Sequence, residues 1–207
     1  MVRPAFRNIL IAAASVSIGL SAAPAAAQFQ SDGYKFLQAV KDKKGDEATA
    51  MLNEPGSTVI NARDISSGET ALHYTVQRRD NLWTGWLLQQ RANPNIADKN
   101  GVTPLGLAIR LNFLEGVETL ITGGARVDEA DFTGQTPLIA AVLSRNSSLV
   151  EILLKANADP DKTDNAGRSA RDYASERGAE RMLMLINQHE STAGADPEDS
   201  RIYGPSF

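Results

Sequence analysis

Hydrophobic and polar positions recur along the chain at a constant interval, which is the spacing from Gly68 to Gly101. An apolar pair recurs at this interval, at Leu87-Leu88, Leu120-Ile121 and Leu153-Leu154. A fourth pair, Leu185-Ile186, lies close to the next expected position. A glycine keeps the same phase, at Gly68, Gly101, Gly134 and Gly167. A hydroxyl residue follows each glycine two places later, at Thr70, Thr103, Thr136 and Ser169. Such a pattern predicts a stack of similar structural units, not a single catalytic motif.

Each unit is predicted to contain two helices. The Thr or Ser after the glycine is a good N-cap for a first helix, and Pro104 and Pro137 occupy its first position, where the missing N–H of proline costs nothing. A short polar turn follows, and then a second helix with apolar residues at helical spacing, as in LVEILLK. Gly124 and Asn157 follow the second helix and favour a left-handed cap, and Arg91 holds the same place one copy earlier. The predicted unit is helix, turn, helix and hairpin-like loop.

The segments GETALH, NGVTPLGLA, TGQTPLIAA and AGRSARDYA resemble the ankyrin repeat. The resemblance implies an all-α ankyrin-repeat solenoid of about five helix-turn-helix units with short hairpin-like loops. The expected repeats are residues 34–64, 65–97, 98–130, 131–163 and 164–190, and the first of them is degenerate. Arg171 stands where the inner copies carry Leu72, Leu105 and Leu138, which is typical of a polar cap on the last repeat of a stack.

The segment 1–27 has the three regions of a secretory signal peptide. Arg3 and Arg7 are followed by an apolar run over residues 9–20 and by small residues up to Ala27. The competing interpretation is a membrane-spanning helix, but the apolar run is short for that. Cleavage after Ala27 would leave a short linker, residues 28–33, before the repeats. The sequence therefore predicts a bacterial protein exported to the periplasm, without stable membrane insertion once the signal is removed.

The end of the chain differs from the repeats. Residues 191–207 are polar and rich in turn-forming residues, which predicts a disordered C-terminal tail. Ile202, Tyr203 and Phe207 lie near its end, so a short docking motif stays open as an alternative to a frayed terminus.

Composition narrows the possible functions. The absence of cysteine excludes a lipid-anchored lipoprotein and a disulfide scaffold. Loss of the signal peptide removes two of the 21 basic residues and none of the 25 acidic ones, so the formal charge changes from −4 to −6. An acidic chain without a basic stripe argues against nucleic acid as the partner.

Residues that could perform chemistry are sparse. The chain has two histidines and no thiol, and the resemblance implies that His73 ties neighbouring loops together by hydrogen bonds. The run DPDKTDNAG lacks the glycine that a calcium loop needs at its sixth place, and Ala170 stands at the twelfth place, where a glutamate is needed. We therefore expect no catalytic, cofactor-binding or metal-binding residues, and a protein that is not an enzyme.

The resemblance implies a non-catalytic protein–protein interaction module. Its expected partner is another protein, whose identity the sequence does not specify, and the chain itself is expected to be a monomer. An accessory or inhibitor subunit of a periplasmic enzyme is the alternative.

In the ankyrin family, contacts come from the loop tips and from the ends of the first helices, which form a concave face. The candidate binding residues carried onto this chain are Arg78, Lys99, Val102, Arg110, Leu111, Phe132, Gln135 and Leu143. Four of them are apolar where a solvated face would be polar, namely Val102, Leu111, Phe132 and Leu143. These four either form an exposed interface or pack between adjacent repeats. Phe132 discriminates best between the two, because a loop tip offers little core in which to bury a ring.

Overall fold

The structure, a computed structural model, describes residues 31–176 and 178–193, so the predicted signal peptide and most of the predicted tail lie outside it. In these residues ten α-helices and the short 3-10 helix η2 (Val59–Asn61) are found. The α-helices are α1 (Asp32–Lys41), α2 (Gly45–Asn53), α3 (Ala71–Gln77), α4 (Asn81–Gln89), α5 (Pro104–Arg110), α6 (Leu114–Thr122), α7 (Pro137–Leu143), α8 (Ser147–Lys155), α9 (Ala170–Glu176) and α10 (Glu180–Ala193). The last helix takes in the first three residues of the predicted tail.

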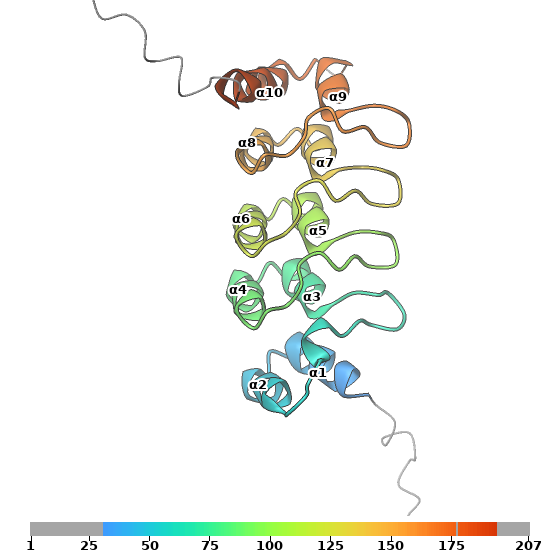
Figure 1. The fold of residues 1–207 in the computed structure, drawn as a ribbon, viewed down its shortest axis with the longest axis vertical. Coiled ribbons are helices and arrows are strands. Elements are labelled where there is room, and N and C mark those ends of the chain that lie inside the picture. Colours follow the sequence, from blue (N-terminus) through green and yellow to red (C-terminus); the bar gives the residue numbers. More distant parts are fainter. Residues whose placement is uncertain (1–30, 177, 194–207) are drawn as a thin grey trace, which may run out of the picture. The chain divides into compact units, whose positions relative to one another are not determined.

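The helices are arranged in pairs that stack in chain order (Figure 1). The first helix of every pair lies in one layer and the second helix in another, and a long loop on the side of the first helices connects each pair to the next (Figure 1). Helix α5 contacts both α3 and α7, and α6 contacts both α4 and α8. The predicted all-α solenoid of helix-turn-helix units is therefore confirmed. We call the side of the loops and first helices the inner face, and the side of the second helices the outer face.

Hydroxyl side chains start the helices, as predicted. Oγ1 of Thr103 accepts a hydrogen bond from the backbone N–H of Gly106, at 3.2 Å, and so satisfies an amide that the first turn leaves unpaired. The first helix begins at Asp32, two residues before the predicted start of the repeats, because the side chain of Ser31 accepts from the N–H of Tyr34.

Left-handed backbone recurs at fixed places in the repeat. Before the first helix, Gly101 and Gly134 have φ of 78° and 79°, as predicted. After the second helix, Arg91, Gly124 and Asn157 have φ of 65°, 90° and 61°. A third set, between the two helices of a pair, was not predicted because its members are not glycines: Lys43, Arg79, Asn112 and Arg145, with φ of 59°, 53°, 52° and 55°. An L-residue in this region costs about 1 kcal/mol.

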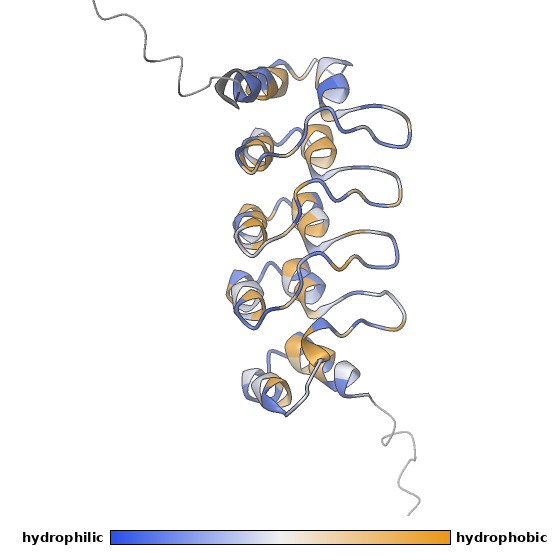
Figure 2. Ribbon diagram, in the orientation of Figure 1, coloured by the Kyte–Doolittle hydropathy of each residue, from blue (hydrophilic) through white to orange (hydrophobic). Residues whose placement is uncertain are grey.

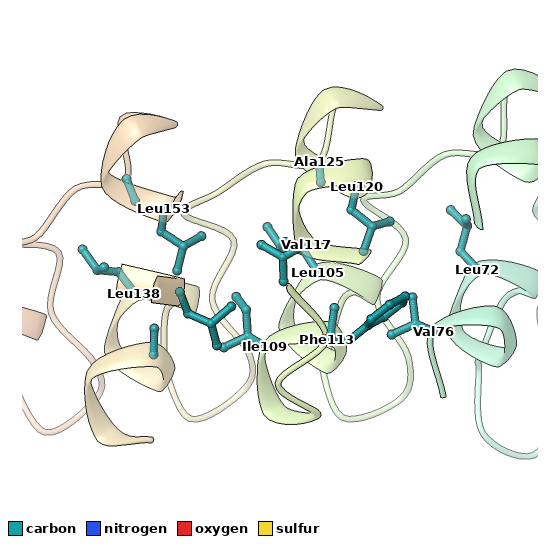
Figure 3. Packing of buried hydrophobic residues seen from close by; sticks show 14 of the residues in the cluster. Leu72, Val76, Leu105, Ile109, Phe113, Val117, Leu120, Ala125, Leu138 and Leu153 are labelled. Carbon is teal, nitrogen blue, oxygen red and sulfur yellow. The ribbon is translucent and has the colours of Figure 1, made fainter. Parts of the chain in front are cut away.

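The core lies between the two layers of helices. Leu72, Leu105 and Leu138 occupy the same place in successive first helices, and all three are fully buried. Figure 3 shows Leu105 beside Val117 of the second helix in the same pair. Hydrophobic residues lie on the helices of both layers, most continuously on α7, whereas the loops are largely hydrophilic (Figure 2). Burial of each leucine contributes about 1.5–3 kcal/mol.

Arg171 ends this series of leucines with a polar network. Its Nε donates to Oδ1 of Asp161 at 2.8 Å, its Nη1 donates to Oδ1 of Asn187 at 2.7 Å, and its guanidinium also pairs with Glu190. The position that is buried in the core of the inner repeats therefore carries a hydrogen-bonded, polar side chain in the last repeat, as predicted.

Candidate protein-binding face

One aspartate fixes each of the loops on the inner face. Oδ1 of Asp98 accepts hydrogen bonds from the backbone N–H groups of Asn100 and Val102, both at 2.8 Å. Asp131 and Asp164 accept from the amides two and four residues further on in the same way. These bonds hold each turn in one conformation.

Neighbouring loops are also bonded to one another. The backbone N–H of the residue after each aspartate donates to a carbonyl of the preceding loop, in the pairs Lys99–Ser67 (2.9 Å), Phe132–Asn100 (3.4 Å) and Asn165–Thr133 (3.2 Å). We call the residues that directly follow the loop aspartates the tip row: Ile65, Lys99, Phe132 and Asn165. The backbone of the last three is held both within its own loop and against the preceding one.

Phe132 is exposed although its surroundings are fixed. The side chain is 73% exposed, so packing between repeats does not account for it. Its ring stands over the backbone of Gly101, since a Cβ atom added to Gly101 would lie 2.6 Å from Cδ1 of the ring. Gly101 therefore serves two purposes, the positive φ of the turn and the space beneath the aromatic ring.

Ile65 belongs to the same row and was missed by the sequence reasoning. Its side chain is 87% exposed. The loop from Asp64 to Gly68 is one residue longer than the loop from Asp98 to Gly101, so counting back from the glycine placed a serine at the tip. Counting forward from the aspartate would have found Ile65.

Val102 corrects one expectation of the sequence reasoning. It is only 6% exposed, so it does not belong to an exposed apolar cluster. Its carbonyl oxygen lies 3.0 Å from Nε2 of His73 in the preceding repeat. Nδ1 of His73 accepts from the N–H of Thr70, at 3.1 Å, so the proton is on Nε2 and is donated to Val102. Burial lowers the pKa of His73, and the predicted structural role of this histidine is confirmed.

Leu111 and Leu143 agree in part with each of the two interpretations of the apolar positions, which are an exposed interface and packing between repeats. Both are half-buried and pack against the hydrophobic core at the ends of the first helices α5 and α7. Each keeps part of its side chain in solvent. They therefore contribute to the core and also present apolar surface beside the loops.

Arg110 and Gln135 border the centre of the inner face. The guanidinium of Arg110 pairs with Asp131 of the next loop. A crevice beside this ion pair is lined by Gly106, Gln135 and Ala140 and has a volume of about 10 Å³. This is about the space of one water molecule, so the crevice does not fit an organic ligand.

Arg78 and Lys99 are tied to the backbone of neighbouring repeats. Nη1 of Arg78 donates to the carbonyl of Val40 at 2.6 Å, so this half-buried side chain fastens α1 to α3. Nζ of Lys99 donates to the carbonyl of Ile65 at 2.6 Å, while the side chain stays exposed on the tip row. Lys99 is thus available to a partner, whereas most of Arg78 is occupied.

No group of side chains suited to holding a metal ion is found in the described part of the chain. Over residues 31–176 and 178–193, no three His, Asp or Glu side chains come together in a way that could hold a metal ion. The one histidine with a lowered pKa, His73, is buried and has both ring nitrogens hydrogen-bonded.

The sequence matches the family described as ankyrin repeats (3 copies) over residues 36–131 and 117–199, which is most of the chain. The chain belongs to the ankyrin repeat family. The resemblance predicted from the repeated motif is confirmed.

Curated relatives contain similar ankyrin repeats in much longer proteins. The chain is 38% identical over 165 residues to the poly [ADP-ribose] polymerase tankyrase of Caenorhabditis elegans, a match that covers 78% of this chain and 7% of that protein. It is 37% identical over 73 residues to the oxysterol-binding protein-related protein 1 of Homo sapiens, covering 35% of this chain and 8% of that protein. It is 30% identical over 81 residues to the oxysterol-binding protein homolog 1 of Saccharomyces cerevisiae, covering 38% and 7%. The chain spans less than a tenth of the length of each of these relatives.

Ankyrin repeats indicate a protein–protein interaction module, and the family is generally non-enzymatic. The prediction of a protein–protein interaction module is therefore confirmed. Among the described helices, none is both long enough and apolar enough to cross a bilayer.

Proposed function

We propose that this ankyrin-repeat chain is a non-catalytic docking module of the bacterial periplasm whose inner face binds a partner protein. The observation that carries the proposal is Phe132, an aromatic side chain 73% exposed on a loop that is hydrogen-bonded to its neighbours. Aromatic anchors often provide a large part of the binding energy of an interface. An anchor whose backbone is already fixed loses little conformational entropy when it binds.

The residues around Phe132 support a protein as the ligand. Ile65 extends the exposed apolar surface along the tip row, and the ammonium group of Lys99 lies between the two. Arg110 and Gln135 add polar groups at the border. An apolar centre with a polar rim is the usual composition of a protein interface.

The partner that fits this surface has an apolar pocket for the ring of Phe132. Acidic or carbonyl groups beside that pocket would face Lys99 and Arg110. The periplasmic location rests on the signal-peptide features of the segment 1–27.

Site-specific photo-crosslinking in the periplasm of a Gram-negative host tests the proposal. A photoreactive phenylalanine analogue replaces Phe132 in one variant and Met184 in the control. Met184 is also a large apolar side chain, 67% exposed, but it lies on α10 and outside the inner face. We expect a covalent adduct with a second protein from position 132 and none from position 184. Adducts of equal yield from both positions, or from position 184 alone, would contradict the proposed site.

The adduct also decides between a simple docking module and a regulator. If the cross-linked protein is an enzyme, its activity is measured with and without this chain. A change in rate would assign the chain as an accessory or inhibitor subunit, and an unchanged rate would assign it as a docking module.

A further inference from the structure

The outer face carries a second surface that is independent of the proposed inner-face function. Helix α4 has no charged residue between Asn81 and Gln89, unlike the other second helices of the described repeats. Leu82 is 82% exposed, and Trp86, one turn further on the same side, is half-buried. The ring of Trp86 packs edge-on against that of Trp83, with centroids 5.1 Å apart, so its position is fixed. An apolar protrusion of this kind is unusual on the solvent side of a helix.

A hollow lies next to this protrusion, between α4 and α6, which stack on each other (Figure 1). It has a volume of about 430 Å³ and is lined on the α4 side by Gly85, Leu88 and Gln89, and on the α6 side by Glu118, Thr119, Thr122 and Gly123. A Cβ atom added to Gly123 would lie 2.7 Å from Cδ1 of Leu88, so the glycine keeps the floor of the hollow open. The same face therefore contains both a protrusion and a hollow.

The polarity of α4 and α6 changes in opposite directions along the chain. Helix α4 carries the apolar Leu82 near its start and Trp86 in its middle, and the exposed Arg91 follows its end. Helix α6 begins with the exposed Glu115 and Glu118 and ends with small uncharged residues. If α4 of one molecule lies antiparallel to α6 of another, its apolar end meets the uncharged end of α6, and Arg91 meets Glu115. A parallel arrangement would instead press Leu82 against Glu115 and bury an unpaired charge.

We propose that this face is the interface of a homodimer, in which two copies of the chain pair about a twofold axis that passes through the groove between α4 and α6. An interface with twofold symmetry uses the same patch on both molecules, so the patch must be complementary to itself. The protrusion of Leu82 and Trp86 and the hollow at Thr122 and Gly123 meet this requirement, since each copy supplies both. Helix α4 brings no charged residue of its own to this contact. The expected monomer is replaced by a dimer whose two inner faces stay open to partners.

Sedimentation equilibrium of the full chain tests the dimer, over protein concentrations from about 1 to about 100 µM. We expect the apparent mass to rise toward twice that of one chain. Leu82→Glu should weaken association at least about tenfold, because it places a charge in the apolar contact. Met184→Glu, which introduces the same charge at an exposed apolar position of α10, is the matched control and should leave the association unchanged. Circular dichroism of each variant verifies that the helices remain folded.

A charge exchange tests the antiparallel arrangement. Arg91→Glu and Glu115→Arg should each weaken the dimer, and the double variant should recover most of the affinity, because it restores an opposite pair. A single species with the mass of one chain over the whole range would overturn the proposal. So would a dimer that Leu82→Glu does not weaken, or a double charge variant no better than the single ones. If the chain is monomeric and Leu82→Glu instead abolishes the binding of a different protein, the face belongs to that protein and the homodimer is wrong.

Discussion

Nε2 of His73 lies 3.0 Å from the carbonyl oxygen of Val102 in the following repeat, and both residues are buried. The bond joins two consecutive repeats through a side chain. It requires a neutral ring, because Nδ1 must accept from the N–H of Thr70 while Nε2 donates. The contact between these repeats therefore depends on the protonation state of one histidine.

We expect acid to weaken the fold through His73. Burial lowers the pKa of His73 below its ordinary value of 6.5, so the unfolded chain takes up the proton at a higher pH than the folded chain does. The stabilisation is complete above about pH 6.5 and is lost as the pH falls from there toward the folded pKa, by at most about 1.4 kcal/mol per pH unit. Urea unfolding at about pH 7.5 and about pH 5.5 measures the loss. His73→Gln should be less stable at the higher pH and should lose less on acidification, whereas an equal loss in both proteins would refute the assignment.

Leu105 tests the shared core. Leu105→Ala should lower the free energy of unfolding by about 2–5 kcal/mol, because it removes a fully buried side chain between two helices. The control is Met184→Ala at an exposed position, which should change it by less than about 0.5 kcal/mol. Urea denaturation of the two variants gives the comparison, and equal effects would show that Leu105 does not support the stack.

Arg91 tests the cost of the left-handed cap. Its φ of 65° is unfavourable for a residue with a side chain, and Gly124 holds the equivalent place one repeat later. Arg91→Gly should therefore raise the free energy of unfolding by about 0.5–1 kcal/mol. The neighbouring Gln90 has an ordinary φ of −78°, so Gln90→Gly should have the opposite sign. Destabilisation by both glycines would mean that the backbone strain at Arg91 is negligible.

The export prediction is tested at the N-terminus of the protein. Expressed in a Gram-negative host, the chain should be recovered from the periplasm beginning at Gln28, with the segment 1–27 removed. N-terminal sequencing together with cell fractionation measures this. An intact Met1 on protein from the cytosol would argue against a cleaved signal.

The sequence was sufficient for the features that each repeat determines by itself. Thr103 caps a helix and Leu105 is buried because their roles follow from local spacing, and both roles recur in phase. Exposure within the loops is different, since it depends on the next repeat in the stack. Val102 is buried beside Gly101, where the ring and backbone of Phe132 from the following loop lie close. No interval within the sequence reveals that approach.

The adjacent residues Arg78 and Arg79 give a second example of this limit. Arg78 donates to the carbonyl of Val40 in the preceding repeat, whereas Arg79 donates to that of Leu111 in the following one. Both side chains therefore donate to carbonyls at the ends of first helices, one in the preceding repeat and one in the following repeat. The two residues are of the same type, so the sequence does not distinguish them. Their side chains differ in direction because the backbone at Arg79 is left-handed.

The proposed binding face depends most on Phe132. The claim is that this side chain binds the partner and does not stabilise the fold. The direct measurement compares wild-type and Phe132→Ala proteins for their thermal midpoint and for their affinity toward the protein recovered by cross-linking. We expect the midpoint to stay within a few degrees, because the side chain is largely exposed, and the dissociation constant to rise at least about tenfold, equivalent to about 1.4 kcal/mol. A large fall in the midpoint together with unchanged affinity of the folded fraction would show that Phe132 stabilises the stack and that the partner binds elsewhere.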